Sequence, residues 1–461
     1  MKGEPDFLQN LRDEMGGGRQ WLDRAVVIAY AVLAGLAVVA LTLLADGAFA
    51  LYSQLRSGWW WAPLLWTPAL TALVVWATRR WAPGAAGSGV PQLLTALDPA
   101  TPLAERPRFV SLRLSVAKIV AVSGGMLAGL SIGRQGPSVQ VAAGVMLHAR
   151  RWLSPASGIS DRELLVAGGA AGIAAAFNTP LGGIVFAIEE LSRRLQDRSS
   201  GLMLAAIVIA GLVAVSAFGN LSYFGRVRAE TMSWWSLLLP GALVALCCGL
   251  LGGLLSRLML ASFTGLPDRF CAYRRKRPVT FAAICGFVVA VIAVVSDGAA
   301  VGVGHEHTKQ LLDQATDPGG SHQPLLFTGL KFIASWLSAW AGVPGGVFGP
   351  SLSLGAGLGA DVAWLLDSPH GVALIALGMC GFLAAVTQTP ITAMIIVMEM
   401  TDGHNMVLSL MASALLASLV SRMISRPLYS TMSLLMMRSI REPAPLDGAG
   451  IPTAPERSAP R

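Results

Sequence analysis

Six short motifs rich in glycine and proline contain the residues of this chain best suited to do chemistry. Each precedes an apolar run, and proline is favoured in the first turn of a helix, where its missing N–H is not needed, so we expect a helix to begin at each. A helix N-terminus presents unpaired N–H groups and about half a positive charge, which suits an anion. The motifs are Gly89-Val90-Pro91, Gly136-Pro137, Thr179-Pro180, Gly349-Pro350, Thr389-Pro390 and Arg426-Pro427.

Hydroxyl groups stand beside two of these breaks. Ser88 lies directly before the first motif, and Tyr429 follows Pro427 by two residues. A full positive charge would hold an anion too tightly for transport, whereas amide dipoles and hydroxyls replace lost hydration and still allow exit. Two simpler interpretations are that Ser88 caps a helix and that Tyr429 anchors the chain at a membrane interface.

The composition indicates which elements must position these groups. Of the 461 residues, 54% are hydrophobic and only 13% are charged, which is about half the charged share of a soluble domain. Apolar stretches close to the roughly twenty residues that cross a bilayer core recur along the chain. We therefore expect an all-α, multi-span membrane protein with broken helices. The stretches are residues 25–44, 61–76, 202–218, 237–258, 281–295 and 407–419.

The charge pattern predicts an orientation. The net charge of +8 could indicate nucleic-acid binding, but the basic residues lie in short flanks of the apolar stretches. The positive-inside rule places the flanks at 79–80, 150–151 and 274–277 in the cytoplasm. Residues 297–323 hold one lysine, Lys309, against four acids, so we expect them outside. The expected partner is a lipid bilayer, that of the cell (inner or plasma) membrane, and no nucleic acid.

An internal repeat runs through the membrane region. Residues 118–144 align with 331–357 at an offset of 213, which pairs a lysine and a Gly-Pro-Ser sequence in the two copies. Residues 174–190 align with 384–400 at an offset of 210. Internally repeated membrane proteins place their substrate site at the repeat interface, where interrupted helices point their ends at the ligand. We therefore expect function at the helix breaks.

The repeat predicts four segments. Residues 25–220 form a first membrane repeat and residues 221–437 a second. Residues 1–24 mix both charge signs and lack the apolar core and cleavage site of a signal peptide, so we expect a cytosolic N-terminal segment. Residues 438–461, rich in Pro, Ala and charge, are expected to form a disordered cytosolic tail.

Four motifs, in this order, resemble those of the CLC chloride channel and transporter family. They are Gly-Ser-Gly-Val-Pro at 87–91, Gly-Arg-Gln-Gly-Pro at 133–137, Gly-Gly-Val-Phe-Gly-Pro at 345–350 and Pro-Leu-Tyr-Ser at 427–430. The segments GIAAAFNTPLGGIVFAIEE and LAAVTQTPITAMIIVMEMTD are also similar to that family. The resemblance implies an antiparallel internal repeat with many tilted, partial helices and a homodimer with one pore per subunit. It also implies chloride or a similar small anion as the transported ligand.

The resemblance further implies roles for single residues. Ser88 and Tyr429 would give hydroxyls to a central anion. The amides of Val347 and Phe348 would contact the same anion, and amides in the second motif would line an outer site. In this family, serine at position 88 accompanies chloride preference and proline accompanies nitrate preference. The predicted anion-binding set is Ser88, Gly89, Val90, Gly133, Arg134, Gln135, Gly136, Pro137, Gly346, Val347, Phe348 and Tyr429.

Gln135, at the gate position, departs from the family pattern. The second motif usually reads Gly-Arg-Glu-Gly-Pro, and its glutamate serves as gate and proton carrier. Glutamine has nearly the shape of protonated glutamic acid but cannot ionise, so it neither competes as an anion nor carries a proton. We therefore expect a passive pathway, or one without strict proton exchange.

Glu190 has two interpretations. It falls where exchangers of the family keep an internal proton-carrying glutamate, and an acid inside an apolar helix is a functional candidate. Glu190 and Arg194 also form an i,i+4 pair at a helix end, as do Glu189 and Arg193, and such pairs are commonly structural. A chloride/proton antiporter that uses Glu190 therefore stays open as the alternative.

Three basic residues in the membrane region also have two interpretations each. Lys118 and Lys331 occupy equal positions in the two repeats. Each either adds positive potential along the anion path, or snorkels or pairs with a carboxylate and so holds its repeat together. Arg134 either attracts anions to the outer site or satisfies backbone carbonyls.

An intramembrane enzyme is the rival from another class. Catalysis needs converging acids, bases, nucleophiles or metal ligands. The sequence holds six histidines, no H-E-x-x-H motif, and five cysteines without C-x-x-C spacing. His305-Glu306-His307 is the nearest approach to a metal site, but adjacent residues in a loop seldom face one ion. We expect no catalytic residues, no metal site and no cofactor, with chloride as the transported ligand.

Overall fold

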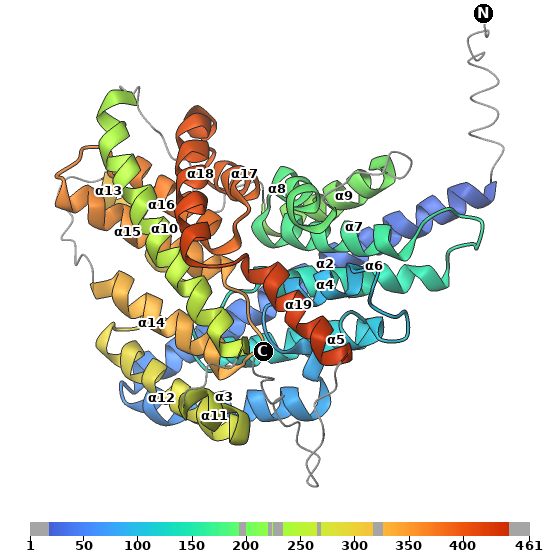
Figure 1. The fold of residues 1–461 in the computed structure, drawn as a ribbon, viewed down its shortest axis with the longest axis horizontal. Helices are drawn as coiled ribbons and strands as arrows, with labels where there is room; N and C mark the ends of the chain where they lie inside the picture. The colour runs from blue at the N-terminus through green and yellow to red at the C-terminus, as the bar shows by residue number, and fades with distance from the viewer. Residues whose placement is uncertain are drawn as a thin grey trace, which may run out of the picture.

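The computed structural model describes residues 18–192, 200–219, 224, 234–264, 269–316 and 326–441. These residues form helices joined by short turns, and their only extended pairing is an isolated bridge between Gly133 and Gly346. The fold is all-α, as predicted (Figure 1). The helices are α2 (Gly18–Gly58), α3 (Ala62–Trp81), α4 (Val90–Leu97), α5 (Leu112–Leu127), α6 (Gln135–His148), α7 (Asp161–Phe177), α8 (Pro180–Phe186), α9 (Ser200–Phe218), α10 (Trp234–Thr264), α11 (Arg269–Lys276), α12 (Pro278–Val295), α13 (His305–Thr316), α14 (Leu326–Ala341), α15 (Phe348–Leu365), α16 (Gly371–Thr387), α17 (Pro390–Thr401), α18 (Val407–Ile424) and α19 (Leu428–Arg441).

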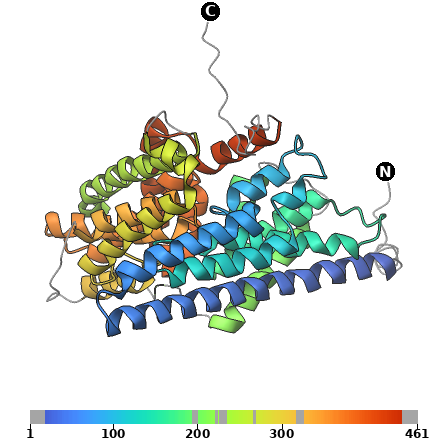
Figure 2. The same cartoon turned by 90° about the horizontal axis from the view of Figure 1, so that it is seen from below.

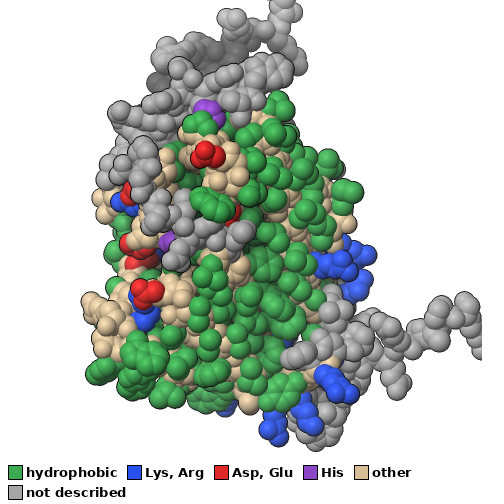
Figure 3. Space-filling view, turned by 90° about the vertical axis from the view of Figure 1, so that its left-hand side faces the viewer, with side chains coloured by type: hydrophobic (Ala, Val, Ile, Leu, Met, Phe, Trp, Pro, Cys, Tyr) green, Lys and Arg blue, Asp and Glu red, His purple; other side chains and the backbone are tan. Residues whose placement is uncertain are grey.

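Six helical segments among the described residues are long and apolar enough to cross a membrane. Five of them contain predicted stretches. The sixth, Arg106–Leu127, was missed because Arg113 and Lys118 interrupt its apolar run. The predicted stretch at 61–76 forms α3, which does not belong to these six. The protein is therefore a multi-pass membrane protein. Figure 3 shows apolar side chains across the middle of one face, with most Lys and Arg on one side and most Asp and Glu on the other.

The helices of the two membrane repeats, which we call the first and second modules, pack in the same way. α6 packs on α7 as α15 packs on α16, and α2 packs on α9 as α10 packs on α18. The modules meet through α3 and α12, through α8 and α17, and at α6 and α15. In Figure 1 most of the first module lies to the right and most of the second to the left. Figure 2 shows α2 along one side of the molecule and α19 on the opposite side.

All six predicted helix starts are confirmed. α4, α6, α8, α15, α17 and α19 each begin within a predicted motif or one residue from it. Two of the breaks have matching local structure. Asn178 directly after α7 and Gln388 directly after α16 are both left-handed, with φ of 59° and 58°. A left-handed residue ends a helix, and the proline two residues later starts the next one. The repeat is therefore visible in the turns as well as in the sequence.

The bridge between Gly133 and Gly346 joins equivalent residues of the two repeats. The N–H of Gly133 donates to the carbonyl of Gly346 at 2.7 Å, and the N–H of Gly346 donates back at 2.6 Å. Because the two residues exchange the same pair of bonds, a local two-fold axis passes between them. This bridge places the starts of α6 and α15 against each other.

Lys118 and Lys331 hold equivalent loops. The Lys118 ammonium donates to the carbonyls of Ala85 (2.8 Å) and Gly87 (2.6 Å). The Lys331 ammonium donates to those of Val301 (3.4 Å) and Gly302 (2.8 Å). The predicted carboxylate pairing is wrong for both lysines, because loop carbonyls near the helix starts take the ammonium protons. Each lysine thereby fixes the chain that leads into α4 or α13.

Glu189 and Glu399 are paired in the repeat alignment. Glu189 of the first repeat caps a helix of the second, and Glu399 of the second repeat caps a helix of the first. The Glu189 carboxylate accepts from the amides of Ile391 (3.2 Å) and Thr392 (2.6 Å) at the start of α17. The Glu399 carboxylate accepts from Leu181 (3.2 Å) and Gly182 (2.8 Å) at the start of α8. Carboxylates satisfy the unpaired N–H groups of a helix start. Glu189 is thus a reciprocal cap, and its predicted partner Arg193 lies outside the described residues, as does Arg194.

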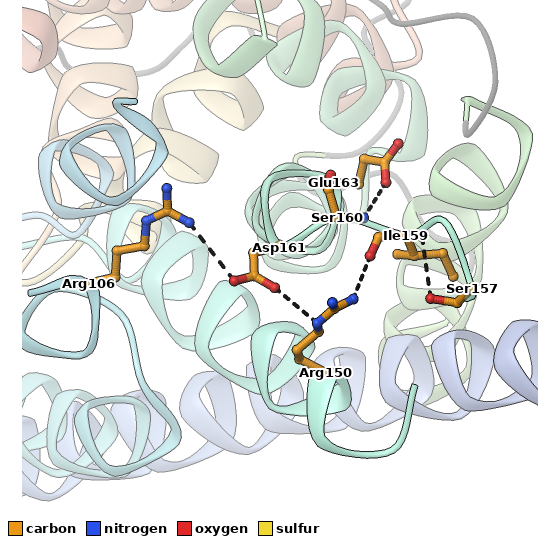
Figure 4. Close-up of polar contacts among 7 residues, drawn as sticks. All are labelled: Arg106, Arg150, Ser157, Ile159, Ser160, Asp161 and Glu163. Carbon is orange, nitrogen blue, oxygen red and sulfur yellow. Dashed lines mark hydrogen bonds and ion pairs between the residues drawn. The ribbon is translucent and has the colours of Figure 1, made fainter. Parts of the chain in front are cut away.

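The connection from α6 to α7 is fixed by a polar cluster (Figure 4). The Asp161 carboxylate contacts Arg106 at 3.9 Å and Arg150 at 3.4 Å, and Arg150 also donates to the carbonyl of Ile159 at 2.7 Å. Ser160 and Glu163 form a capping box at the start of α7. The cluster therefore ties the far end of α6 to the next helix and leaves its N-terminus directed at the bridge.

Candidate anion-binding site

Three helix starts converge beside the bridge. A Cβ atom on Gly89, before α4, would lie 2.7 Å from the carbonyl oxygen of Gly136. A Cβ atom on Gly136 would overlap the Ser88 hydroxyl, and one on Gly346 would lie 2.9 Å from the amide nitrogen of Gly136. Gly89 also has a φ of +112°, which L residues rarely adopt. Only glycine lets the starts of α4, α6 and α15 approach this closely.

The hydroxyls of Ser88 and Tyr429 face each other at this point. Ser88 is 8% exposed and Tyr429 is 1% exposed. The two side chains are neighbours, but among the described residues neither hydroxyl has a hydrogen-bond partner of good geometry. Beyond each other, the two hydroxyls have no hydrogen-bond partner in the described part of the chain, which makes the space beside them a candidate ligand position.

Phe348 closes one side of this position. Its ring stacks on Tyr429 with centroids 5.8 Å apart and contacts Phe177 and Phe186 edge-on. Val347 is the N-cap residue of α15, so the first amides of that helix lie at the same place. These amides have no intrahelical acceptor. The predicted residues Ser88, Val347, Phe348 and Tyr429 are thus brought together.

A glutamine that sequence analysis missed fixes the Ser88 loop. The Gln92 side chain accepts from the amide of Gly89 at 2.9 Å and donates to the carbonyl of Ala86. A hydrogen bond of 3.0 Å between Thr95 and Ser433 joins α4 to α19, and so places Tyr429. A glutamine at the third helical position is only half of the capping-box signal, and the N-cap residue here is Gly89, so the sequence did not mark Gln92.

Gln135 lies beside the bridge, between Gly133 and Gly349. Its side chain is 1% exposed, and its Oε1 atom would lie 2.7 Å from a Cβ on Gly133 and 3.1 Å from one on Gly349. The amide head therefore sits against the start of α15. It borders a cavity of about 10 Å³, also lined by Val303, Gly304, His305 and Thr308, which is about the size of one water.

Arg134 has a carboxylate partner that sequence analysis missed. Its guanidinium forms an ion pair with Asp46 of α2. The two residues are 88 positions apart, so no local pattern links them. The pair fixes the start of α6 to the long helix of the same module.

Glu190 lies on the Tyr429 side of the site. It belongs to a π-helical turn, Ala187–Ser192, is half-buried, and lies within electrostatic range of Tyr429. Such turns are frequent at functional sites.

The two histidines of His305-Glu306-His307 point to different surroundings. The His305 ring packs on Phe224 with centroids 5.0 Å apart, and the His307 ring packs on Phe327 at 3.9 Å. The part of the chain that the structure describes contains no group of three or more His, Cys, Asp or Glu residues that could hold a metal ion.

Broken helices that meet around buried hydroxyls, here those of Ser88 and Tyr429, are typical of membrane transport proteins. Residues 70–422 match the family model described as voltage gated chloride channel, which is more than half of the chain. The protein therefore belongs to the voltage gated chloride channel family, the CLC family, and this family comprises channels and transporters rather than enzymes.

Similar proteins agree with this assignment. The H(+)/Cl(-) exchange transporter ClcA of Vibrio parahaemolyticus is 31% identical over 394 residues, with 80% of this chain and 79% of that protein covered. The ClcA protein of Klebsiella pneumoniae is 31% identical over 406 residues, with coverage of 82% and 80%. The fold is similar to a slow cyanobacterial Cl-/H+ antiporter, with a TM-score of 0.73, 21% identity and coverage of 92% and 99%. The fold class predicted from the motifs is confirmed.

Proposed function

We propose that this protein carries chloride across the membrane without strict proton exchange. Its relatives are named H(+)/Cl(-) exchange transporters, which supports chloride as the ion. The observation that carries the uncoupled mechanism is the side chain of Gln135, which is buried between Gly133 and Gly349 at the start of α15. An amide there cannot ionise, so it cannot compete with chloride or carry a proton.

The proposed path uses partial charges rather than a full one. The hydroxyls of Ser88 and Tyr429 and the amides of Val347 and Phe348 would hold a central chloride. Amides around Gln135 and Gly136 would hold an outer one, with Gly89, Val90, Gly133, Arg134, Pro137 and Gly346 shaping the two positions. Helix dipoles and hydroxyls compensate dehydration at modest affinity, which permits release.

The central test is chloride efflux from liposomes with simultaneous proton recording. The native protein should move chloride down its gradient with no stoichiometric proton counterflow. Active proton uptake against its gradient, driven by chloride, would contradict the proposal. In crystals soaked in bromide, an anomalous peak is expected between Ser88 and Tyr429.

The variant Gln135→Glu sharpens this test. A carboxylate at the gate occupies an anion position when ionised and resembles the native amide when protonated. Chloride flux should therefore be near native at acidic pH and fall as pH rises through the pKa of the new carboxyl. Gln135→Asn, which cannot ionise either, is the matched control and should show no such pH profile. A Gln135→Glu profile as flat as that control would argue against a gate at this position.

A chloride/proton antiporter that uses Glu190 is the second candidate. It is favoured by the placement of Glu190 within electrostatic range of Tyr429. Reversal potentials under a pH gradient separate the two, because a passive chloride pathway ignores that gradient and an exchanger follows it. If the potential shifts, Glu190→Gln should abolish the shift while chloride flux continues.

We also propose a homodimer in the cell (inner or plasma) membrane, with both termini in the cytosol. Exposed leucines on α9 and α18, such as Leu212 and Leu419, offer an apolar face for a second copy. Light scattering of the purified protein tests the dimer, and cysteine accessibility at Arg80 and Arg275 in sealed vesicles tests the orientation.

A further inference from the structure

A second, larger cavity lies behind the loop that carries Ser88. Its volume is about 870 Å³, and none of the predicted anion-binding residues lines it. The ends of α3 and α14, the starts of α5 and α12, and parts of α11 and α19 surround it. This volume lies in the range of pockets that hold small organic molecules.

Four arginines line this cavity, which we call the arginine cavity: Arg79, Arg108, Arg113 and Arg274. The only acid in its lining is Glu105, which forms an ion pair with Arg108 at 2.5 Å. Three positive charges are therefore left without an acid in the lining. Guanidinium groups bind phosphate oxygens through two parallel hydrogen bonds, so a phosphate is the natural counterpart of such a set.

Arg274 is the most enclosed of these arginines. It comes from α11, and its guanidinium donates to the carbonyl of Ser262 at 2.5 Å. Burial lowers the pKa of this guanidinium, because the charged form loses hydration. A bound anion would replace part of that lost hydration.

The rest of the lining is apolar. Trp81, Phe263 and Met436 contribute aromatic and thioether surface beside the arginines. A small inorganic anion would leave this surface uncovered. Basic pockets between membrane helices on the cytoplasmic side bind the headgroups of acidic lipids.

We propose that the arginine cavity binds a phosphate group that is attached to an apolar body. An acidic phospholipid is the source that the mixed lining favours, and a soluble organic phosphate is the other source of the same chemistry. Ala86, Gly87 and Gln92 line the cavity and also hold the loop of Ser88, so an occupant contacts the residues that position the anion site. Occupancy should therefore change the rate of anion transport.

The test uses the purified full-length protein in detergent. Native mass spectrometry measures binding of phosphatidylglycerol and of phosphatidylcholine, and calorimetry measures binding of ATP and of inorganic phosphate. The double variant Arg79→Gln/Arg113→Gln removes two charges from the cavity. Arg80→Gln/Arg275→Gln removes two charges from neighbouring exposed positions that do not line it, and serves as the matched control.

We expect phosphatidylglycerol to bind the native protein and phosphatidylcholine to bind much more weakly. The cavity variant should raise the dissociation constant for phosphatidylglycerol about tenfold or more, because it loses charge-assisted hydrogen bonds, and the control should change it less than about twofold. If ATP shows this dependence instead and the lipid does not, the site is supported with a soluble phosphate as its ligand.

Arg274→Lys provides a second variant that keeps the charge. It removes the two-pronged geometry, so binding of the phosphate probe should weaken several-fold while the unfolding temperature stays close to native. Equal weakening in the cavity and control variants would overturn the proposal, because it would show only general attraction. Displacement of every probe by chloride at the concentrations that saturate transport would also overturn it, since the cavity would then be an entrance for the transported ion.

Discussion

The two loops that lead into α4 and α13 differ in chemistry although they share a framework. Each has two glycines with positive φ, Gly87 and Gly89 in the first loop and Gly302 and Gly304 in the second. A buried lysine, Lys118 or Lys331, holds the carbonyls of each loop. Between the glycines, the first loop has Ser88 and the second has Val303.

The helix starts that face these two loops also carry different residues at equivalent positions. At the repeat offset of 213, Gln135 of α6 corresponds to Phe348 of α15. Gly136 lies against Ser88, and Gly349 lies against Val303, where a Cβ would approach Val303 Cγ1 to 2.5 Å. The scaffold is duplicated, but a hydroxyl stands between the two glycines in the first loop only. The repeat therefore provides the geometry, and in the proposed function single residue differences within it separate the side that binds the anion from the side that carries the gate position.

The largest expected effect comes from breaking the shared framework. Lys118→Met should leave two loop carbonyls unsatisfied, cost about 2 kcal/mol of stability and reduce chloride flux at least about tenfold, because the Ser88 loop would shift. Lys331→Met should cost similar stability and reduce flux less, since its loop carries no hydroxyl. Thermal unfolding and liposome flux of both variants check this. Equal flux losses at equal stability would mean that the two loops contribute alike.

Exchanging the residues between the glycines tests the difference directly. Ser88→Val should weaken chloride binding about tenfold, as expected for the loss of one hydrogen bond to a charged ligand. The reciprocal variant Val303→Ser should leave binding near native. Calorimetric titration with chloride measures both. A strong effect of Val303→Ser would place the principal site beside the second loop.

Ser88→Pro gives a third comparison on the same position. The family pattern associates proline there with nitrate, so the ratio of nitrate to chloride flux should rise several-fold. Anion-replacement measurements in liposomes test this, with Ser88→Ala as the control for simple loss of the hydroxyl. A ratio that matches the alanine control would assign selectivity to other residues.

The smallest expected effect concerns the reciprocal caps. Glu189→Gln and Glu399→Gln should each destabilise the protein by about 1 kcal/mol, because a neutral amide caps a helix start less well than a carboxylate. Their effects should be equal within a few tenths of a kcal/mol if the caps are equivalent. Thermal unfolding of the two variants measures these losses of stability. Glu163→Gln, which changes a cap distant from the bridge, is the comparison.

The helix starts and the repeat could be predicted from sequence because proline and glycine act locally. Pro137 and Pro350 mark their helix starts wherever the chain runs, and the matched lysines mark equal positions. The partners of the lysines could not be predicted. Every residue has a backbone carbonyl, so the sequence does not indicate which carbonyls lie near each ammonium. Arg134 and Asp46 meet only through the packing of α2 on α6, so that pair was also missed.

The candidate site was predictable in membership but not in arrangement. The motifs identified Ser88, Phe348 and Tyr429 as members. The stacking of Phe348 on Tyr429 depends on how α19 packs against α4, which no spacing reveals. The segment boundaries and the anion-binding roles stay predictions. The roles concern a bound ligand, and the boundaries concern how the chain divides into repeats and terminal segments.

The reciprocal caps and the glycine bridge have a consequence for biosynthesis. Glu399 accepts hydrogen bonds from the start of α8, and Gly346 exchanges hydrogen bonds with Gly133. Both partners belong to the carboxy-terminal half, so the amino-terminal half leaves the ribosome before these amides can be paired. A chain truncated after the first module would have no conducting pathway of its own. Expressing the two halves as separate polypeptides in one cell should restore conduction only when both insert together.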